Sequence, residues 1–147
     1  MNNSAKNCLK TAFDHYQTAE HLFHTTLPIA KEPKLLLGIM QSLANSLEHA
    51  LESIFIQEKL ASPQNLLQKI NAVRSLAAKY HLSPEDIVFM LRIQEILYQQ
   101  KRSPVEFNRG SSHVLCSDDY DLEVISVQEV EKFLHHTKKI LNLLNSA

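Results

Sequence analysis

The chain has 147 residues, a size that suits one domain or one compact helical bundle. It contains only two glycines, and 15 basic residues nearly balance 16 acidic ones, for a formal net charge of −1. The glycine count excludes Gly-rich phosphate loops and dinucleotide-binding fingerprints, and it argues against a many-stranded sandwich or barrel. The near-zero net charge argues against nucleic-acid binding over the whole surface, but it does not exclude a local basic patch.

The first half of the chain has the apolar spacing of long helices. This spacing predicts one helix over about residues 4–25 and a second over about residues 34–60, with a connector marked by Pro28 and Pro33. The apolar stripe of the second helix is broad, which suits a helix with neighbours on two sides. Ser62-Pro63 is typical of an N-cap followed by proline at the first helical position, so we expect a third helix from there to about Tyr80.

Two further capping patterns mark the second half. Ser83, followed by Pro84 and two acids, predicts a fourth helix that continues to about Lys101. Ser126 and Glu129 form a capping-box pattern, which predicts a fifth helix to the C-terminus. Between these helices the period changes to short alternating stretches. The predicted fold is therefore all-α, an up-and-down bundle of five helices, with a partly extended loop and a small hairpin at about residues 103–125.

This layout resembles the HEPN superfamily, whose members are small helical bundles. The likeness rests on Tyr16-x-x-Ala19 in the first helix, on the long second helix containing residues 41–52, and on the end of the fourth helix. There, Arg102-Ser103-Pro104 is similar in position to an Arg-Tyr-Pro stretch of members that partner nucleotidyltransferases. The resemblance covers the whole chain as one HEPN-like domain, residues 1–147. It implies a helical protein that works with a nucleotidyltransferase or acts as a ribonuclease.

Nuclease-type members of that superfamily carry an arginine and a histidine separated by four to six residues. The resemblance implies that the arginine contacts phosphate and that the histidine positions or activates the 2′-hydroxyl. Arg109 and His113 lie in the corresponding late region, but only three residues separate them. This departure weakens the transfer of nuclease activity to the chain.

Three functions follow as hypotheses. The leading one is a non-catalytic HEPN-like accessory protein that binds a nucleotide or nucleic acid and works with a nucleotidyltransferase or similar partner. The first alternative is a metal-independent endoribonuclease that uses Arg109 and His113. The second is a structural interaction module without a ligand.

Candidate site residues fall into two groups. Lys101, Arg102, Arg109 and His113 make the loop after the fourth helix locally basic, and we expect them to hold phosphate. Glu20 falls inside the apolar stripe of the first helix, where a carboxylate needs a partner, and His49 on the second helix is the candidate. We therefore expect Glu20 and His49 to form a buried polar pair between these helices.

The remaining expectations concern metals, compartment and assembly. Cys8 and Cys116 are too few and too far apart for a disulfide framework or a paired-cysteine zinc site, and we expect neither a metal nor a cofactor. No apolar run reaches the length of a membrane span and no signal-peptide core is present, so we expect a cytoplasmic protein without membrane contact. Arg92 and Glu95 are expected to pair at the surface. The wide apolar faces of the second and fourth helices predict a homodimer through helical faces.

Overall fold

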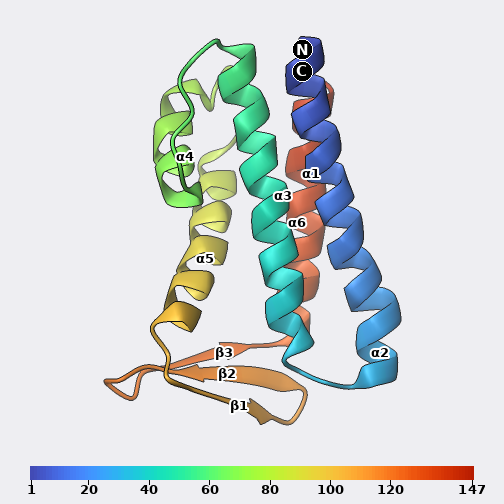
Figure 1. The fold of residues 1–147 in the computed structure, drawn as a ribbon, viewed down its shortest axis with the longest axis vertical. Helices are drawn as coiled ribbons and strands as arrows, with labels where there is room; N and C mark the ends of the chain where they lie inside the picture. The colour runs from blue at the N-terminus through green and yellow to red at the C-terminus, as the bar shows by residue number, and fades with distance from the viewer.

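A computed structural model describes residues 1–147 (Figure 1). In chain order the elements are α1 (Asn3–His21), α2 (Leu27–Ala30), α3 (Leu35–Gln57), α4 (Leu66–Val73), α5 (Pro84–Lys101), β1 (Val105–Arg109), β2 (Ser112–Cys116), β3 (Leu122–Ile125) and α6 (Val127–Asn145). A π-helical turn (Leu22–Thr26) joins α1 to α2, and a 3₁₀ turn (Arg74–Leu76) follows α4. The prediction of an all-α fold is therefore wrong, because a three-stranded antiparallel sheet accompanies the helices.

The long helices α1, α3, α5 and α6 form an antiparallel bundle, and α4 packs against α3 and α5 (Figure 1). α3 lies at the centre of this arrangement and contacts α1, α4, α5 and α6. Its side chains Ile39, Leu43 and Leu47 are fully buried within one protomer. The broad apolar stripe that predicted a helical-face homodimer is thus covered by the chain itself.

The first helix continues further than its apolar spacing predicts. Pro28 has no N–H, and in a regular α-helix its ring would clash with the carbonyl four residues earlier. The chain widens into the π-helical turn just before this proline, where the N–H of Leu27 bonds the carbonyl of Leu22. The helical path therefore continues through Ala30 and ends at Lys31, which has a left-handed φ of 51°.

The capping predictions have mixed outcomes. Ser83 caps α5 and Ser126 caps α6 as expected, each accepting a hydrogen bond from the N–H three residues later. The predicted helix start at Ser62-Pro63 is wrong. α4 begins at Leu66, because the side chain of Asn65 accepts the hydrogen bond from the N–H of Gln68 at 2.9 Å.

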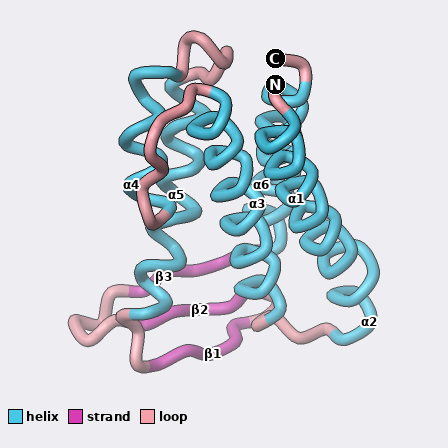
Figure 2. Tube along the Cα trace, turned by 45° about the horizontal axis from the view of Figure 1, so that its top comes forward, coloured by secondary structure: helices cyan, strands magenta, loops and turns pink.

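The sheet closes the end of the bundle opposite the two chain termini (Figures 1 and 2). Its strands lie in the order β1-β2-β3, and all neighbours are antiparallel. A two-residue turn joins Arg109 to its partner Ser112, with Gly110 at a φ of 61°. A positive φ at only the first turn position is the type II′ pattern, which favours glycine there. Leu115 and Ile125 join the core of the bundle from the inner face of the sheet.

Candidate functional site

His113 lies on the inner face of the sheet and is held from both sides. Its Nε2 is 2.8 Å from Oε1 of Glu106, and its Nδ1 is 3.0 Å from Oδ1 of Asn108. Asn108 in turn donates to the carboxylate of Glu32, which precedes α3, at 2.9 Å. The hydrogen bond with His113 is the main cause that lowers the pKa of Glu106. With 2% of its surface exposed and both ring nitrogens engaged, His113 is a structural group that ties the sheet to the bundle.

Arg109 does not converge on His113. Successive residues of a strand point to opposite faces, and His113 is paired with Asn108, the residue directly before Arg109. Arg109 therefore projects from the outer face of the sheet, where it is exposed. The structure separates the two side chains on which the nuclease alternative depends.

Lys101 and Arg102 lie at the end of α5, where that helix meets the sheet. Arg102 donates to the hydroxyl of Tyr98 at 2.7 Å, and its guanidinium carbon is 5.4 Å from the centre of that ring. The end of β1 that follows Arg102 in the chain is about 14 Å from Arg109, since the strand rises by about 3.4 Å per residue. The predicted four-residue phosphate site therefore divides into three separate places.

The predicted pair between Glu20 and His49 is not formed. Glu20 is hydrogen-bonded to Tyr16 one helical turn earlier. The pKa of Tyr16 is raised to about 12, mainly by burial and secondly by this contact. His49 places its Nδ1 2.9 Å from the carbonyl oxygen of Asn45 and packs its ring against His15, with 5.0 Å between the ring centres. Glu20 thus has its partner on its own helix, and His49 has one partner on its own helix and one on the adjoining helix.

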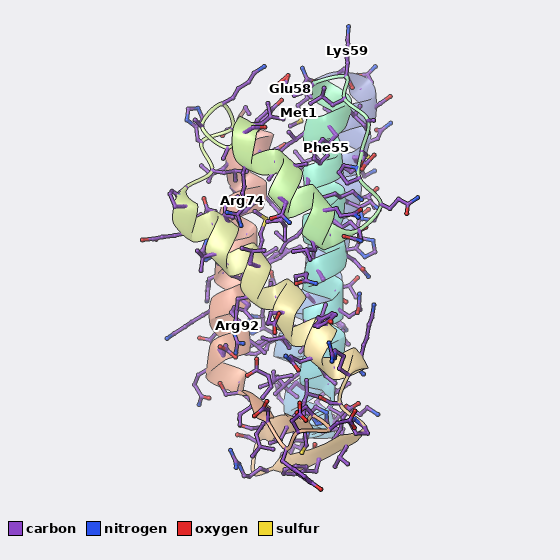
Figure 3. All side chains as sticks on the ribbon, turned by 90° about the vertical axis from the view of Figure 1, so that its left-hand side faces the viewer. Met1, Phe55, Glu58, Lys59, Arg74 and Arg92 are labelled. Carbon is purple, nitrogen blue, oxygen red and sulfur yellow. The ribbon has the colours of Figure 1, made fainter.

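Two ion-pair groups that were not predicted from the sequence join separate elements. Arg92 was expected beside Glu95, but it bonds Glu123 of β3 and lies 3.4 Å from Glu129 at the start of α6. Figure 3 shows Arg92 on the side of the bundle where α5 and α6 lie next to each other. The second group pairs Asp86 of α5 with His136 of α6 at 2.6 Å. No sequence spacing links these partners, because they are more than thirty residues apart.

The most promising cavity is a groove of about 420 Å³ between α3, the start of α4 and the end of α5. Its apolar lining comes from Ala44, Leu66, Leu67 and Leu97, together with the ring of Tyr98. Its polar lining consists of Gln41, Glu48, Gln64, Asn65, Gln94 and Lys101. Of the four residues predicted to bind phosphate, Lys101 alone lines this groove.

A second depression of about 450 Å³ adjoins this groove and extends it toward the sheet. Gln41 and Leu97 line both cavities, and Lys34 lines the second. The acids along this path already have partners: Glu48 lies 3.2 Å from Lys69, and Glu32 accepts from Asn108. Lys34 and Lys101 take part in no salt bridge. The charge of Lys34 acts on Glu32 and Glu106, so Lys101 is the cation left for an anion.

The comparisons with known proteins assign no family to the chain. Its sequence matches no family model, and the search of curated proteins returned no match. The structure contains no group of three or more His, Cys, Asp or Glu side chains arranged to hold a metal ion. None of its helices combines the length and the apolar character that a membrane crossing requires.

Proposed function

We propose that the chain is a non-catalytic, HEPN-like accessory protein that binds a nucleotide unit, free or within single-stranded RNA, and presents it to a partner such as a nucleotidyltransferase. The observation that carries this proposal is the groove between α3 and α5. It combines an apolar floor and an exposed aromatic ring with amide side chains and an unpaired lysine at its rim.

Each part of the groove suits one part of a nucleotide. Tyr98 is 45% exposed, and the part of its ring that Arg102 does not cover is available for base stacking beside Leu97. The amides of Gln64 and Gln94 offer paired donors and acceptors to a base edge, and Gln41, whose Nε2 donates to Asn45, adds an acceptor. Lys101 supplies a cation for phosphate. The groove volume is within the range of about 300–1,000 Å³ that small-molecule sites occupy.

The nuclease alternative lacks comparable support. It requires Arg109 and His113 to face one phosphodiester, and these side chains project from opposite faces of the sheet. His113 is also buried and hydrogen-bonded through both nitrogens. The accessory function needs neither residue at its binding site.

Binding is tested by titrating the chain into fluorescent ATP and, separately, into a short fluorescein-labelled single-stranded RNA, with anisotropy as the readout. We expect Tyr98→Ala and Lys101→Ala each to weaken binding by about tenfold, as loss of a base stack or a phosphate contact does. Lys132→Ala, an exposed lysine of α6 far from the groove, is the matched control and should bind like the unmodified chain.

The two probes distinguish a free nucleotide from RNA as the source of the bound unit. Saturable binding of ATP assigns the groove to free nucleotides, whereas binding of RNA alone assigns it to single strands. If neither probe binds at high micromolar protein concentration, or if Lys132→Ala weakens binding as much as Lys101→Ala, the groove is not a nucleotide site.

A further inference from the structure

The outer face of the sheet, which is turned away from the bundle, is mainly apolar, and the side chains at its edges are exposed. It carries two cross-strand rows, Phe107–Val114–Val124 and Val105–Cys116–Leu122. Val105 and Leu122 are each 53% exposed and Phe107 is 40% exposed. Val114 at the centre is fully buried yet lies outside the core cluster of the bundle. The outer face therefore forms a small apolar cluster of its own, and the exposed side chains at its edges are open to contact with a partner.

The two ends of this face carry opposite charge. At one end, Arg109 stands at the turn between β1 and β2. At the other end, the connection between β2 and β3 contains Asp118, Asp119 and Asp121, all of them exposed. Arg102 lies close enough to Asp118 and Asp119 for their charges to act on it, but it offsets only one of three negative charges. The face thus has a single arginine at one end, an apolar centre and an acidic end.

We propose that this face binds a second copy of the chain. A two-fold axis parallel to the sheet and perpendicular to its strands reverses the strand direction of the second copy. The apolar rows then meet at the centre, and Arg109 of each protomer lies over the acidic connection of its partner. A two-fold axis along the strands would instead place like charges together, so charge complementarity selects the first arrangement.

The size of the face sets the strength of this contact. Three strands spaced about 4.8 Å apart, with about 3.4 Å per residue, give a footprint of roughly 15 by 17 Å before the turns are added. This footprint of about 250 Å² per chain is below the size of standard specific interfaces, so the expected dimer is weak and reversible, with a Kd in the micromolar range. The interface differs from the helical faces predicted from the sequence and is independent of the nucleotide groove.

The first test is sedimentation equilibrium of the full chain from about 5 to 500 µM, which brackets a micromolar Kd. We expect a monomer–dimer equilibrium, and we expect Phe107→Asp to raise the Kd at least about tenfold. Val88→Asp on α5 is the matched control, because Val88 is 65% exposed and lies away from the sheet. A chain that stays monomeric throughout, or a dimer weakened equally by both substitutions, overturns the proposal.

The second test exchanges the charges at the two ends of the face. Arg109→Asp and Asp119→Arg should each weaken the dimer, and the double variant should recover most of the loss, because the exchanged charges face each other again. All of these positions are exposed, and circular dichroism checks that the variants fold. Losses that simply add in the double variant overturn the two-fold arrangement, even where Phe107→Asp dissociates the dimer.

Discussion

Asp86 serves two helices at once. Its N–H and carboxylate form a reciprocal capping box with Ser83, and its other carboxylate oxygen lies 2.6 Å from Nε2 of His136 on α6. Nζ of Lys139 is 3.6 Å from the same oxygen. Burial alone would raise the pKa of Asp86, but the hydrogen bonds from His136 and Ser83 and the charge of Lys139 outweigh it. The pKa of Asp86 is therefore lowered from its ordinary value of 3.8.

Replacing His136 by phenylalanine should isolate this hydrogen bond. The His136 ring stacks on Phe89 with 4.1 Å between centres, and a phenylalanine preserves that stacking. We expect His136→Phe to lower the free energy of unfolding at about pH 7 by about 1–3 kcal/mol, because a buried carboxylate loses its donor. Urea denaturation monitored by circular dichroism measures this difference.

The stabilising contribution of Asp86 depends on pH in a known direction. A carboxyl group with a lowered folded pKa stabilises the fold above its unfolded value, here 3.8, and loses that contribution as the pH falls through the lower folded value. The difference between the wild type and His136→Phe should therefore shrink toward about pH 3. His135→Phe, at the exposed neighbouring position, should cost little at either pH. If the difference in the free energy of unfolding between the wild type and His136→Phe does not change with pH, the Asp86 contact is not its source.

The β1–β2 hairpin depends on Gly110. A Cβ at this position meets nothing within 4 Å, so its φ of 61° is the reason for glycine there. Gly110→Ala should lower the free energy of unfolding by about 1 kcal/mol, because an L side chain disfavours the left-handed region. Thermal unfolding followed by circular dichroism gives the comparison.

Gly110→Asn is the matched control, because asparagine tolerates positive φ better than alanine. We expect Asn to cost less than Ala at this position. Equal losses in both variants would locate the effect outside the backbone conformation.

The sequence predicted the helices far better than the sheet. Helical spacing and the serine caps at Ser83 and Ser126 are local signals, and both helices start where those signals place them. The scarcity of glycine argues against a many-stranded sandwich or barrel, but it does not argue against this small sheet, which needs only one glycine turn. At the second turn, Tyr120 adopts a φ of 63° although it is not glycine.

The candidate site was less predictable for a geometric reason. Arg109 and His113 are close in sequence, yet the two-residue turn pairs Arg109 with Ser112 and so sends the two side chains to opposite faces. The opposite placement of these two side chains becomes clear only when the pairing register of the hairpin is known. The groove combines α3, the α3–α4 connection and α5, and no spacing within one segment indicates that these meet. Lys101 lines the groove and is among the predicted residues, because the basic stretch that contains it is a local feature of the sequence.

At the scale of the whole molecule, Arg92 links the sheet to the bundle. It joins α5 to Glu123 of β3 and to Glu129 of α6, and thus adds polar contacts among these three elements to their apolar packing. We expect Arg92→Met to lower the free energy of unfolding by about 1 kcal/mol, since the ion pairs are partly exposed. Amide hydrogen exchange over residues 122–125 should become faster.

Arg74→Met provides the control for this substitution, because Arg74 is exposed and takes part in no salt bridge. Exchange in β3 should remain unchanged in that variant. If Arg92→Met leaves β3 protection intact, Leu115 and Ile125 suffice to hold the sheet on the bundle.

The position of the sheet at the end opposite both termini also determines what an assembly would look like in solution (Figure 1). α3 alone is about 34 Å long at 1.5 Å per residue, and the sheet lies beyond its first turn. Two chains joined through their sheets would form a rod about 90 Å long, whereas two chains joined along their helices would stay compact. Small-angle X-ray scattering separates these shapes by their longest dimension. In the rod, a label or surface tether at either terminus would lie at its tip, far from the contact.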